Sequence, residues 1–326
     1  MPRLATLVIS IGRLLSRMNQ PKVSIITLNW NGLEDTIECL ESLKKITYPN
    51  YEVIVVDNGS KGDDAQVLEE RFGDCIHLIK NDKNYGFGGG YNIAMRHVLN
   101  NSNPDYLLLL DNDTVVDPEF LTEMVKVAEA DPAIGIAGAK IYYYDEPDRL
   151  QYLGGKIDLW VGVVRPSGII RERIIGRKEI DSGQHDSIKE VEQIAFWCAL
   201  FRRKSLESIG LFNERYFWGW ENIDYFIRAR EAGCKVVYIP KAKVWHKYRS
   251  TNRIDGFLQY HSPRSHFRLM KQHATKWQYR SFLIYFFGVH FWLATVYYLI
   301  WLRQPGMLLS FYKGVKDGLF SSQDDD

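Results

Sequence analysis

Two carboxylates, Asp111 and Asp113, stand one residue apart directly after the apolar run LLLL. One chemistry open to such a pair is covalent, with Asp111 attacking a phosphoryl group and Asp113 moving the proton. Another is metal binding, in which the two carboxylates hold a divalent cation whose other ligands are the oxygens of a sugar diphosphate. An alternative without chemistry is a polar strand end that caps the helix expected to start near Pro118.

The elements around this pair predict where its partners lie. From residue 22 onward, short β-rich runs alternate with segments of helical periodicity, which predicts an α/β fold with a mostly parallel sheet flanked by helices. Asn29, Asp57, Asn81 and Asp111 each end an apolar run. Ligands of such sheets bind outside the carboxyl ends of the strands, so we expect these four side chains to converge on one site.

A glycine-rich turn, GFGGGYN, occupies residues 86–92 before a helix that we expect over residues 90–100. The free N–H groups and the positive dipole end of a helix suit a diphosphate, although a tight turn that lets the helix pack on the sheet explains the glycines equally well.

The pattern is less regular beyond residue 150. Residues 152–168 suggest a β-ribbon, and residues 166–190 resemble a mobile or variable loop. A strand is expected over QIAFWCALFRR, helices over 204–209 and 222–232, and a last short strand, KVVYIP, that Pro240 stops.

The C-terminal part combines positive charge with an uncharged apolar run. Residues 241–320 hold 13 Lys and Arg against two acids, whereas the chain before them is net acidic. Residues 282–302 contain no charged side chain, and at about 1.5 Å per residue they could span roughly 32 Å, the thickness of a bilayer core. Five basic residues precede this run: Arg264, Arg268, Lys271, Lys276 and Arg280. This pattern predicts a membrane-associating tail on the cytoplasmic side, either peripheral or crossing once; a buried helix in an oligomer is the alternative.

Residues 1–20 contain three arginines, no acid and apolar residues at helical spacing, which indicates a basic amphipathic segment at a membrane surface. The four cysteines show no disulfide-framework spacing, which favours a reducing compartment.

Six segments of the sequence, taken in order along the chain, resemble the motifs of glycosyltransferase family 2. They are VSIITLNWNG, YEVIVVDNGS, DKNYGFGGGYNIA, LLLLDNDTVVDP, FWCALFRRKSLESIGLFNERYFWGWENIDYFIRAREAG and VVYIPKAKVWH. The last two resemble the rhamnosyltransferase-like branch, and the resemblance covers about residues 22–250. It implies a GT-A fold over residues 21–255, with a nucleotide half (21–115) and an acceptor half (116–255), followed by the membrane-associating tail at 256–326.

The resemblance also implies roles for single residues. The donor nucleotide sugar would be bound by Thr27, Asn29, Asp57, Gly86, Gly88, Asn92 and Asp111. Mg²⁺ or Mn²⁺ would be held by Asp111, Asp113 and His246, although a lone histidine after a strand is also a common surface or capping residue.

The helix that begins at WENID supplies the candidate base. Glu221 and Asp224 match acids of the family's Glu-Asp-x-Asp segment, whereas Asn222 replaces the usual middle acid. We therefore expect Glu221 to be the base that deprotonates the acceptor, with Asp224 as second choice. Arg228, four residues after Asp224, is expected to pair with it. Trp197 and Trp220 are candidates for stacking on the acceptor sugar, and core packing explains them equally well.

The predicted function is an inverting, metal-dependent glycosyl transfer from a dTDP- or UDP-sugar, with rhamnose as a candidate sugar, in cell-surface glycan synthesis. The acceptor would be a saccharide or a polyprenyl-linked saccharide at the membrane; no nucleic acid partner is expected, and an oligomer is possible. Two alternatives remain at this stage. One is a sugar phosphatase that resembles the haloacid dehalogenases and uses Asp111 as nucleophile, and the other is a non-catalytic subunit that binds nucleotide sugars.

Overall fold

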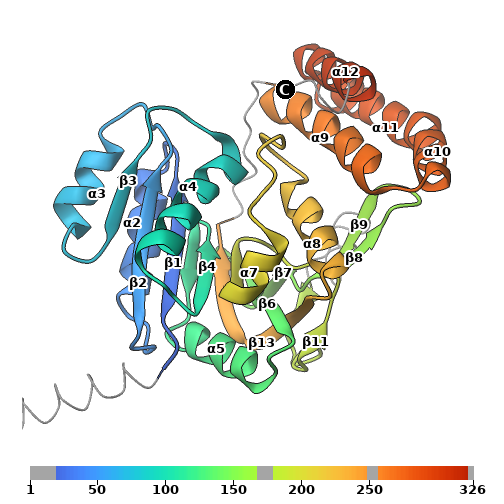
Figure 1. Cartoon of the computed structure of the whole chain (residues 1–326). Helices are drawn as coiled ribbons and strands as arrows, with labels where there is room; N and C mark the ends of the chain where they lie inside the picture. Colours follow the sequence, from blue (N-terminus) through green and yellow to red (C-terminus); the bar gives the residue numbers. More distant parts are fainter. Residues whose placement is uncertain (1–19, 167–178, 248–255, 322–326) are drawn as a thin grey trace, which may run out of the picture.

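The computed structural model describes residues 20–166, 179–247 and 256–321 (Figure 1). The predicted amphipathic segment at residues 1–20 lies outside this part of the chain, apart from Gln20.

The predicted nucleotide half, residues 21–115, is a parallel sheet flanked by helices, as the alternating pattern predicts. Its strands run in the order β4-β1-β2-β3, and all three neighbouring pairs are parallel. The strands are β1 (Val23–Asn29), β2 (Tyr51–Asp57), β3 (His77–Lys80) and β4 (Tyr106–Leu110). The helices are α2 (Leu33–Leu43), α3 (Asp64–Phe72) and α4 (Gly86–Asn101). Apolar side chains on both faces of β1 and β4 are fully buried, because helices cover both faces of the sheet.

The predicted acceptor half, residues 116–255, continues the same sheet. Strand β12 (Cys198–Arg202) lies antiparallel between β4 and β6 (Ile134–Tyr143), and β13 (Lys235–His246) runs parallel to β6. The further strands are β5 (Thr114–Val116), β6 (Ile134–Tyr143), β7 (Arg149–Tyr152), β10 (Glu179–Ile180), β11 (Lys189–Glu190), β12 (Cys198–Arg202) and β13 (Lys235–His246). The helices are α5 (Phe120–Ala130), α7 (Arg203–Ile209) and α8 (Glu221–Glu231). The mostly parallel α/β fold is thus confirmed.

Pro240 does not stop the last strand, contrary to the prediction. β13 continues through it to His246, and the register with β6 shifts between Ile239 and Lys243. Proline cannot donate to a ladder but fits an irregularity of this kind, so the strand bends and resumes. The consequence is functional, because the added residues carry His246 to a position opposite Thr114 of β5.

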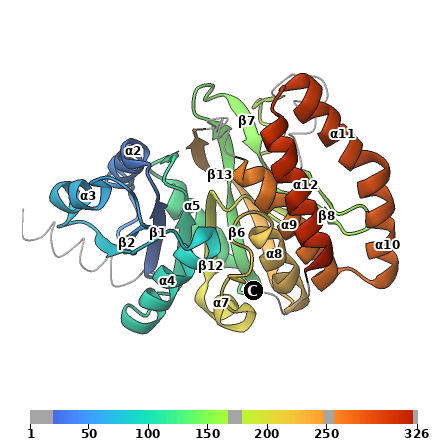
Figure 2. The same cartoon turned by 90° about the horizontal axis from the view of Figure 1, so that it is seen from above.

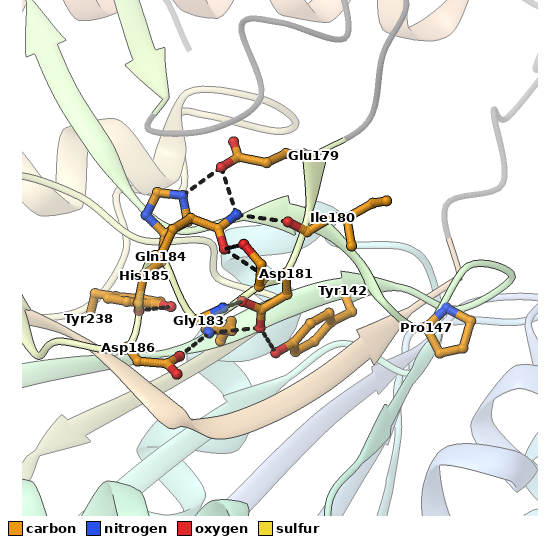
Figure 3. Close-up of polar contacts among 12 residues, drawn as sticks. Tyr142, Pro147, Glu179, Ile180, Asp181, Gly183, Gln184, His185, Asp186 and Tyr238 are labelled. Carbon is orange, nitrogen blue, oxygen red and sulfur yellow. Dashed lines mark hydrogen bonds and ion pairs between the residues drawn. The ribbon is translucent and has the colours of Figure 1, made fainter.

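The predicted β-ribbon is present as β8 (Gly155–Asp158) and β9 (Val163–Pro166). The predicted variable loop is only partly described, and residues 179–190 of it are ordered against the sheet. The buried Lys140 of β6 pairs with Asp181 at 2.8 Å and with Asp186 at 2.6 Å. Tyr142 also donates a hydrogen bond to Asp181, and Tyr238 donates to the carbonyl of His185 (Figure 3). This part of the predicted loop is therefore fixed.

Helices follow the sheet at the C-terminal end and gather on one side of the molecule (Figure 2). They are α9 (Phe257–His273), α10 (Lys276–Tyr285), α11 (Phe291–Val296) and α12 (Pro305–Phe320), with π-helical turns at Phe286–His290 and Tyr297–Trp301. The continuous helix Lys276–Trp301 is long and apolar enough to cross a membrane, by length and composition alone. Its inner side packs with α9 and α12 around Phe267, Phe286 and Phe311, while its outer side exposes large apolar side chains, including Trp301 at 80%.

Candidate active site

The carboxyl ends of β1 and β2 are joined by a network of side-chain hydrogen bonds. Asn29 and Asp57 are neighbours in register across β1 and β2, and Nδ2 of Asn29 donates to Oδ1 of Asp57 at 2.8 Å. The same amide also donates to Asp64 at 3.0 Å, and its oxygen accepts from the hydroxyl of Thr36 at 2.8 Å. Thr27, farther back on β1, is fully buried. The fold therefore brings Asn29 and Asp57 together as predicted, with their polar atoms already bonded within the protein.

The glycine turn that opens α4 is tightly enclosed by protein. Gly86 has a left-handed φ of 77°, and a Cβ there would lie 2.4 Å from the carbonyl oxygen of Phe217. A Cβ on Gly88 would lie 3.1 Å from Phe212. Asn58 holds this turn, since its amide donates to the carbonyl of Gly86 at 3.1 Å. The glycines thus let the turn approach the segment before α8, which is the packing role that the sequence left open.

Asn92, predicted to bind the donor, joins the two halves of the protein instead. Its side chain is fully buried, and Nδ2 donates to the carbonyl of Phe212 at 2.9 Å and to Glu214 at 2.8 Å. Its oxygen accepts from the N–H of Phe212 at 2.9 Å. Because its amide group is saturated by these bonds, we assign Asn92 a positioning role rather than a ligand contact.

The two aspartates after β4 face a histidine. Nε2 of His246 lies 3.4 Å from Oδ1 of Asp113, and this buried carboxylate oxygen accepts no hydrogen bond. Tyr91 donates to Oδ1 of Asp111 at 3.0 Å. Burial raises the pKa of Asp111 to about 7; the charges of Asp113 and Glu221 act in the same direction, whereas His246 and Tyr91 oppose it. Asp111 and these four groups therefore share one electrostatic environment.

A divalent cation fits this arrangement if the substrate completes its coordination. Within residues 20–166, 179–247 and 256–321, no three His, Cys, Asp or Glu side chains are grouped to hold a metal by themselves. Two ligands of one metal, each about 2.1 Å from it and at right angles, are about 3 Å apart. The separation between His246 and Asp113 is close to that value, and the unbonded oxygen of Asp113 is free to coordinate.

His246 is held by two residues that the sequence did not single out for this purpose. Nδ1 lies 3.1 Å from Oε1 of Gln151 on β7, and the amide oxygen can only accept, so Nδ1 carries the proton and Nε2 presents its lone pair. The indole of Trp197 stacks on the imidazole with ring centroids 4.2 Å apart and an interplanar angle of 8°. Trp197, predicted to contact the acceptor, therefore packs on a candidate metal ligand.

Glu221 begins α8 and has the properties of a base. The side chain is buried, yet its Oε2 has no hydrogen-bond partner. Burial raises the pKa of Glu221 to about 7, and backbone N–H groups of Glu221 itself and of Gly219 limit the shift. A carboxylate with a pKa near neutrality and a free oxygen can take a proton from a hydroxyl group.

Asp224, the second candidate base, has hydrogen-bond partners at both of its carboxylate oxygens. Arg228 donates to Oδ2 at 2.9 Å, as its spacing predicts, and Gln272 donates to Oδ1 at 3.1 Å. Nε2 of His273 lies 2.8 Å from the same Oδ1. This side chain is fully buried and connects α8 with α9. Because both carboxylate oxygens of Asp224 already have hydrogen-bond partners, we infer a structural role for this residue. Glu221 remains the candidate base.

Trp220, the second predicted acceptor contact, precedes Glu221 and stacks on His266 of α9, with centroids 3.9 Å apart and an interplanar angle of 9°. Gln151, Tyr91 and His266 contact candidate site residues and were missed by sequence reasoning. Tyr91 had a signal, because it stands within the glycine-rich motif. Gln151 and His266 had none, since they reach their partners from 95 and 46 residues away.

Comparison with known proteins places the chain in a family. The sequence model of glycosyl transferase family 2 matches residues 24–210, more than half of the chain, and the chain belongs to this family. This assignment confirms the predicted family and disfavours the phosphatase alternative for the aspartate pair; Glu221, Asp224 and His246 lie beyond the matched residues.

Two curated relatives and one solved structure are informative. The O-antigen biosynthesis protein RfbC of Myxococcus xanthus is 26% identical over 72% of this chain and 18% of its own length. The N-acetylglucosaminyl-diphospho-decaprenol L-rhamnosyltransferase of Mycobacterium tuberculosis is 24% identical over 73% of this chain and 81% of its own. GalNAc-T7, solved with UDP, GalNAc and Mn²⁺, superposes with a TM-score of 0.61 at 16% identity, covering 86% of this chain and 58% of that one. This last likeness shows the GT-A-like fold. The chain spans less than a quarter of RfbC, a far longer protein.

Proposed function

We propose that the protein is an inverting, metal-dependent glycosyltransferase with Glu221 as its base. The observation that carries this proposal is the free, buried oxygen of Glu221 in the same electrostatic environment as the Asp111 and Asp113 pair. Glu221 accepts the proton of an acceptor hydroxyl, whose oxygen bonds to the anomeric carbon of the donor as the bond to the nucleoside diphosphate breaks. Attack opposite the leaving group inverts the configuration at that carbon.

Asp113 and His246 would hold Mg²⁺ or Mn²⁺, with Asp111 beside them. When bound, the cation neutralises the charge that develops on the leaving diphosphate. Gln151 and Trp197 orient the imidazole of His246 so that Nε2 is available to the cation. One oxygen of Asp113 is left without a hydrogen bond and is available in the same way. The Mn²⁺ in the solved GalNAc-T7 structure supports this choice of metal.

The donor would be a dTDP- or UDP-sugar, bound at the ends of β1 and β2 near Asn29 and Asp57. A lipid-linked saccharide is the favoured acceptor, as the name of the rhamnosyltransferase relative says of that protein. The exposed apolar side of helix Lys276–Trp301 supports a membrane location. Because the opposite side packs on α9 and α12, we propose that this helix lies along the cytoplasmic membrane surface and does not cross alone.

A nucleotide-sugar panel tests the proposal. The purified protein is mixed with UDP-, dTDP- and GDP-sugars with and without Mn²⁺, and thermal stabilisation and donor hydrolysis are measured. A transferase is stabilised by one donor class in the presence of Mn²⁺ and hydrolyses it slowly without acceptor. Stabilisation without any turnover, even with lipid-linked acceptors, would favour a binding subunit. Phosphate release from sugar phosphates would favour the phosphatase.

The membrane assignment has its own test. Trp292, Ile300 and Trp301 are at least 60% exposed on the outer side of the helix. Changing all three to Gln should release the protein from anionic vesicles in a flotation assay while thermal stability is kept, since these side chains pack on little of the protein. Flotation equal to wild type would contradict this surface as the anchor.

A further inference from the structure

Helix α9 packs against the segment that carries the candidate base, and both lie beyond the residues matched by the family model. The ring of His261 stacks on Phe217, and the hydroxyl of Ser265 donates to the carbonyl of Trp218 at 3.1 Å. Gln272 and His273 bond Asp224. Besides His266, the residues of α9 that contact segment 215–224 include His261, Ser265, Arg268, Leu269, Gln272 and His273. Their spacing of three and four residues places them on one face of the helix.

His266 is enclosed at the centre of this contact. Its ring stacks on Trp220 on one side and lies 4.8 Å from the ring of Phe282 of α10, centroid to centroid. Gly162, in the turn of the β8–β9 ribbon, approaches so closely that a Cβ there would lie 2.7 Å from Nε2 of His266. Three elements from different parts of the chain therefore meet on one imidazole.

Trp220 needs such support because its backbone is in a rare conformation. Its φ is 71° and its ψ is −5°, a left-handed geometry that is unfavourable for a bulky residue. Such residues persist where the surroundings hold them. The backbone N–H groups of Gly219 and Glu221, which stabilise the charged form of Glu221, flank Trp220 directly. The conformation of Trp220 thus sets where the carboxylate of Glu221 lies.

We propose that His266 is a positioning residue, whose ring holds Trp220 in its left-handed conformation and thereby fixes Glu221 in the orientation that accepts the proton of the acceptor. This inference rests on the proposed function of Glu221. It makes α9 part of the catalytic unit and restricts the membrane-facing part of the tail to the helices after it.

The role requires a flat ring and no charge. Burial lowers the pKa of His266 to about 3, so the imidazole is neutral at every working pH. A phenylalanine can therefore replace it in the stack, whereas a leucine fills similar volume without presenting a flat face to the indole.

The test compares His266→Leu, His266→Phe and Met270→Ala in the full-length protein. Met270 lies one turn after His266 on α9, is buried in the cluster with Phe267 and Phe311, and serves as the matched stability control. Initial rates are measured against acceptor, donor and pH. We expect His266→Leu to lower kcat on the order of 10²-fold, as for a misplaced catalytic group, while the donor KM stays near that of wild type. The acid limb of its pH–rate profile should move to lower pH, because Glu221 gains contact with water. His266→Phe should recover most of the rate.

The possible results separate the claims. Equal kcat and pH profiles for His266→Leu and Met270→Ala would overturn the positioning role. A His266→Phe variant as slow as His266→Leu would also overturn it, because the imidazole itself would then be required. Absence of transfer by the wild-type protein with every donor and acceptor would instead refute the proposed function.

Discussion

The polar residues at the ends of β1 and β2 differ from those around Asp113 and Glu221 in how completely they are bonded. Asn29 and Asp57 make hydrogen bonds to each other and to Thr36, Ser60 and Asp64. In contrast, a buried oxygen of Asp113 and one of Glu221 have no hydrogen-bond partner.

We propose that, among the acids of the site, this difference separates those that hold its structure from those that react in it. An unbonded buried oxygen costs about 1–3 kcal/mol of stability, which a ligand can return by completing its bonds. A saturated group costs nothing comparable and can only position its neighbours. On helix α8, Glu221 and Asp224 are both buried acids one turn apart, and only Glu221 keeps a free oxygen.

The largest effect on the rate of transfer is expected from substitution of Glu221, the acid of α8 that keeps an unbonded oxygen. Glu221→Gln keeps the shape of the side chain but removes the base, so kcat should fall about 10²–10⁴-fold with little change in donor binding. Glu231→Gln, at the exposed end of the same helix, is the matched control and should retain full activity. A Glu221→Gln enzyme as active as the control would refute the role of Glu221.

Substitution of Asp224, whose carboxylate is fully hydrogen-bonded, should lower the stability of the protein more than its activity. Asp224→Asn leaves the Arg228 guanidinium without its buried carboxylate, so the free energy of unfolding should fall by roughly 3 kcal/mol, measured by urea denaturation. The kcat of the folded enzyme should fall far less than in Glu221→Gln. A stable but inactive Asp224→Asn would reverse the assignment of the two acids.

A smaller effect, on metal affinity, is expected from substitution of Gln151, which orients the imidazole of His246. Gln151→Leu removes the acceptor that fixes the proton on Nδ1, so Mn²⁺ affinity in the presence of nucleoside diphosphate should weaken roughly 10- to 100-fold. Isothermal titration calorimetry measures this directly. Unchanged affinity would show that the stack with Trp197 is sufficient to orient the imidazole.

The smallest effect concerns the pH dependence of stability. Because the pKa of Glu221 is raised to about 7 in the folded state, its ionisation disfavours folding as pH rises from about 4.5 to 7. Glu221→Gln should therefore melt a few degrees above wild type at pH 8, and this difference should vanish near pH 4.5. Thermal unfolding curves at both pH values check the sign; a variant less stable at pH 8 would contradict it.

The same comparison explains what the sequence could predict. The sheet, its flanking helices and the strand-end positions of Asn29, Asp57 and Asp111 follow from local patterns of apolar and polar residues. Whether a polar side chain is saturated depends on distant segments, as with Asn92 and the 212–214 segment or Asp224 and α9. Pro240 misled the prediction because the partner strand β6 tolerates a shift of register there. The packing of α9 on α8 was not predicted for a similar reason. The basic residues before the apolar run indicated a separate membrane-associating tail, and their contacts lie in distant segments. Lys271, one of those basic residues, instead donates to carbonyls at the end of α12.

The central claim, that Asp113 holds the metal on which transfer depends, is tested most directly by one comparison of rates. Glycosyl transfer by wild type and by Asp113→Ala is measured across a Mn²⁺ titration at saturating donor, with circular dichroism to verify folding. The account predicts Mn²⁺-dependent transfer by wild type and none by the folded variant at any Mn²⁺ concentration. Full transfer by Asp113→Ala, or wild-type transfer undiminished by a chelator, would contradict it.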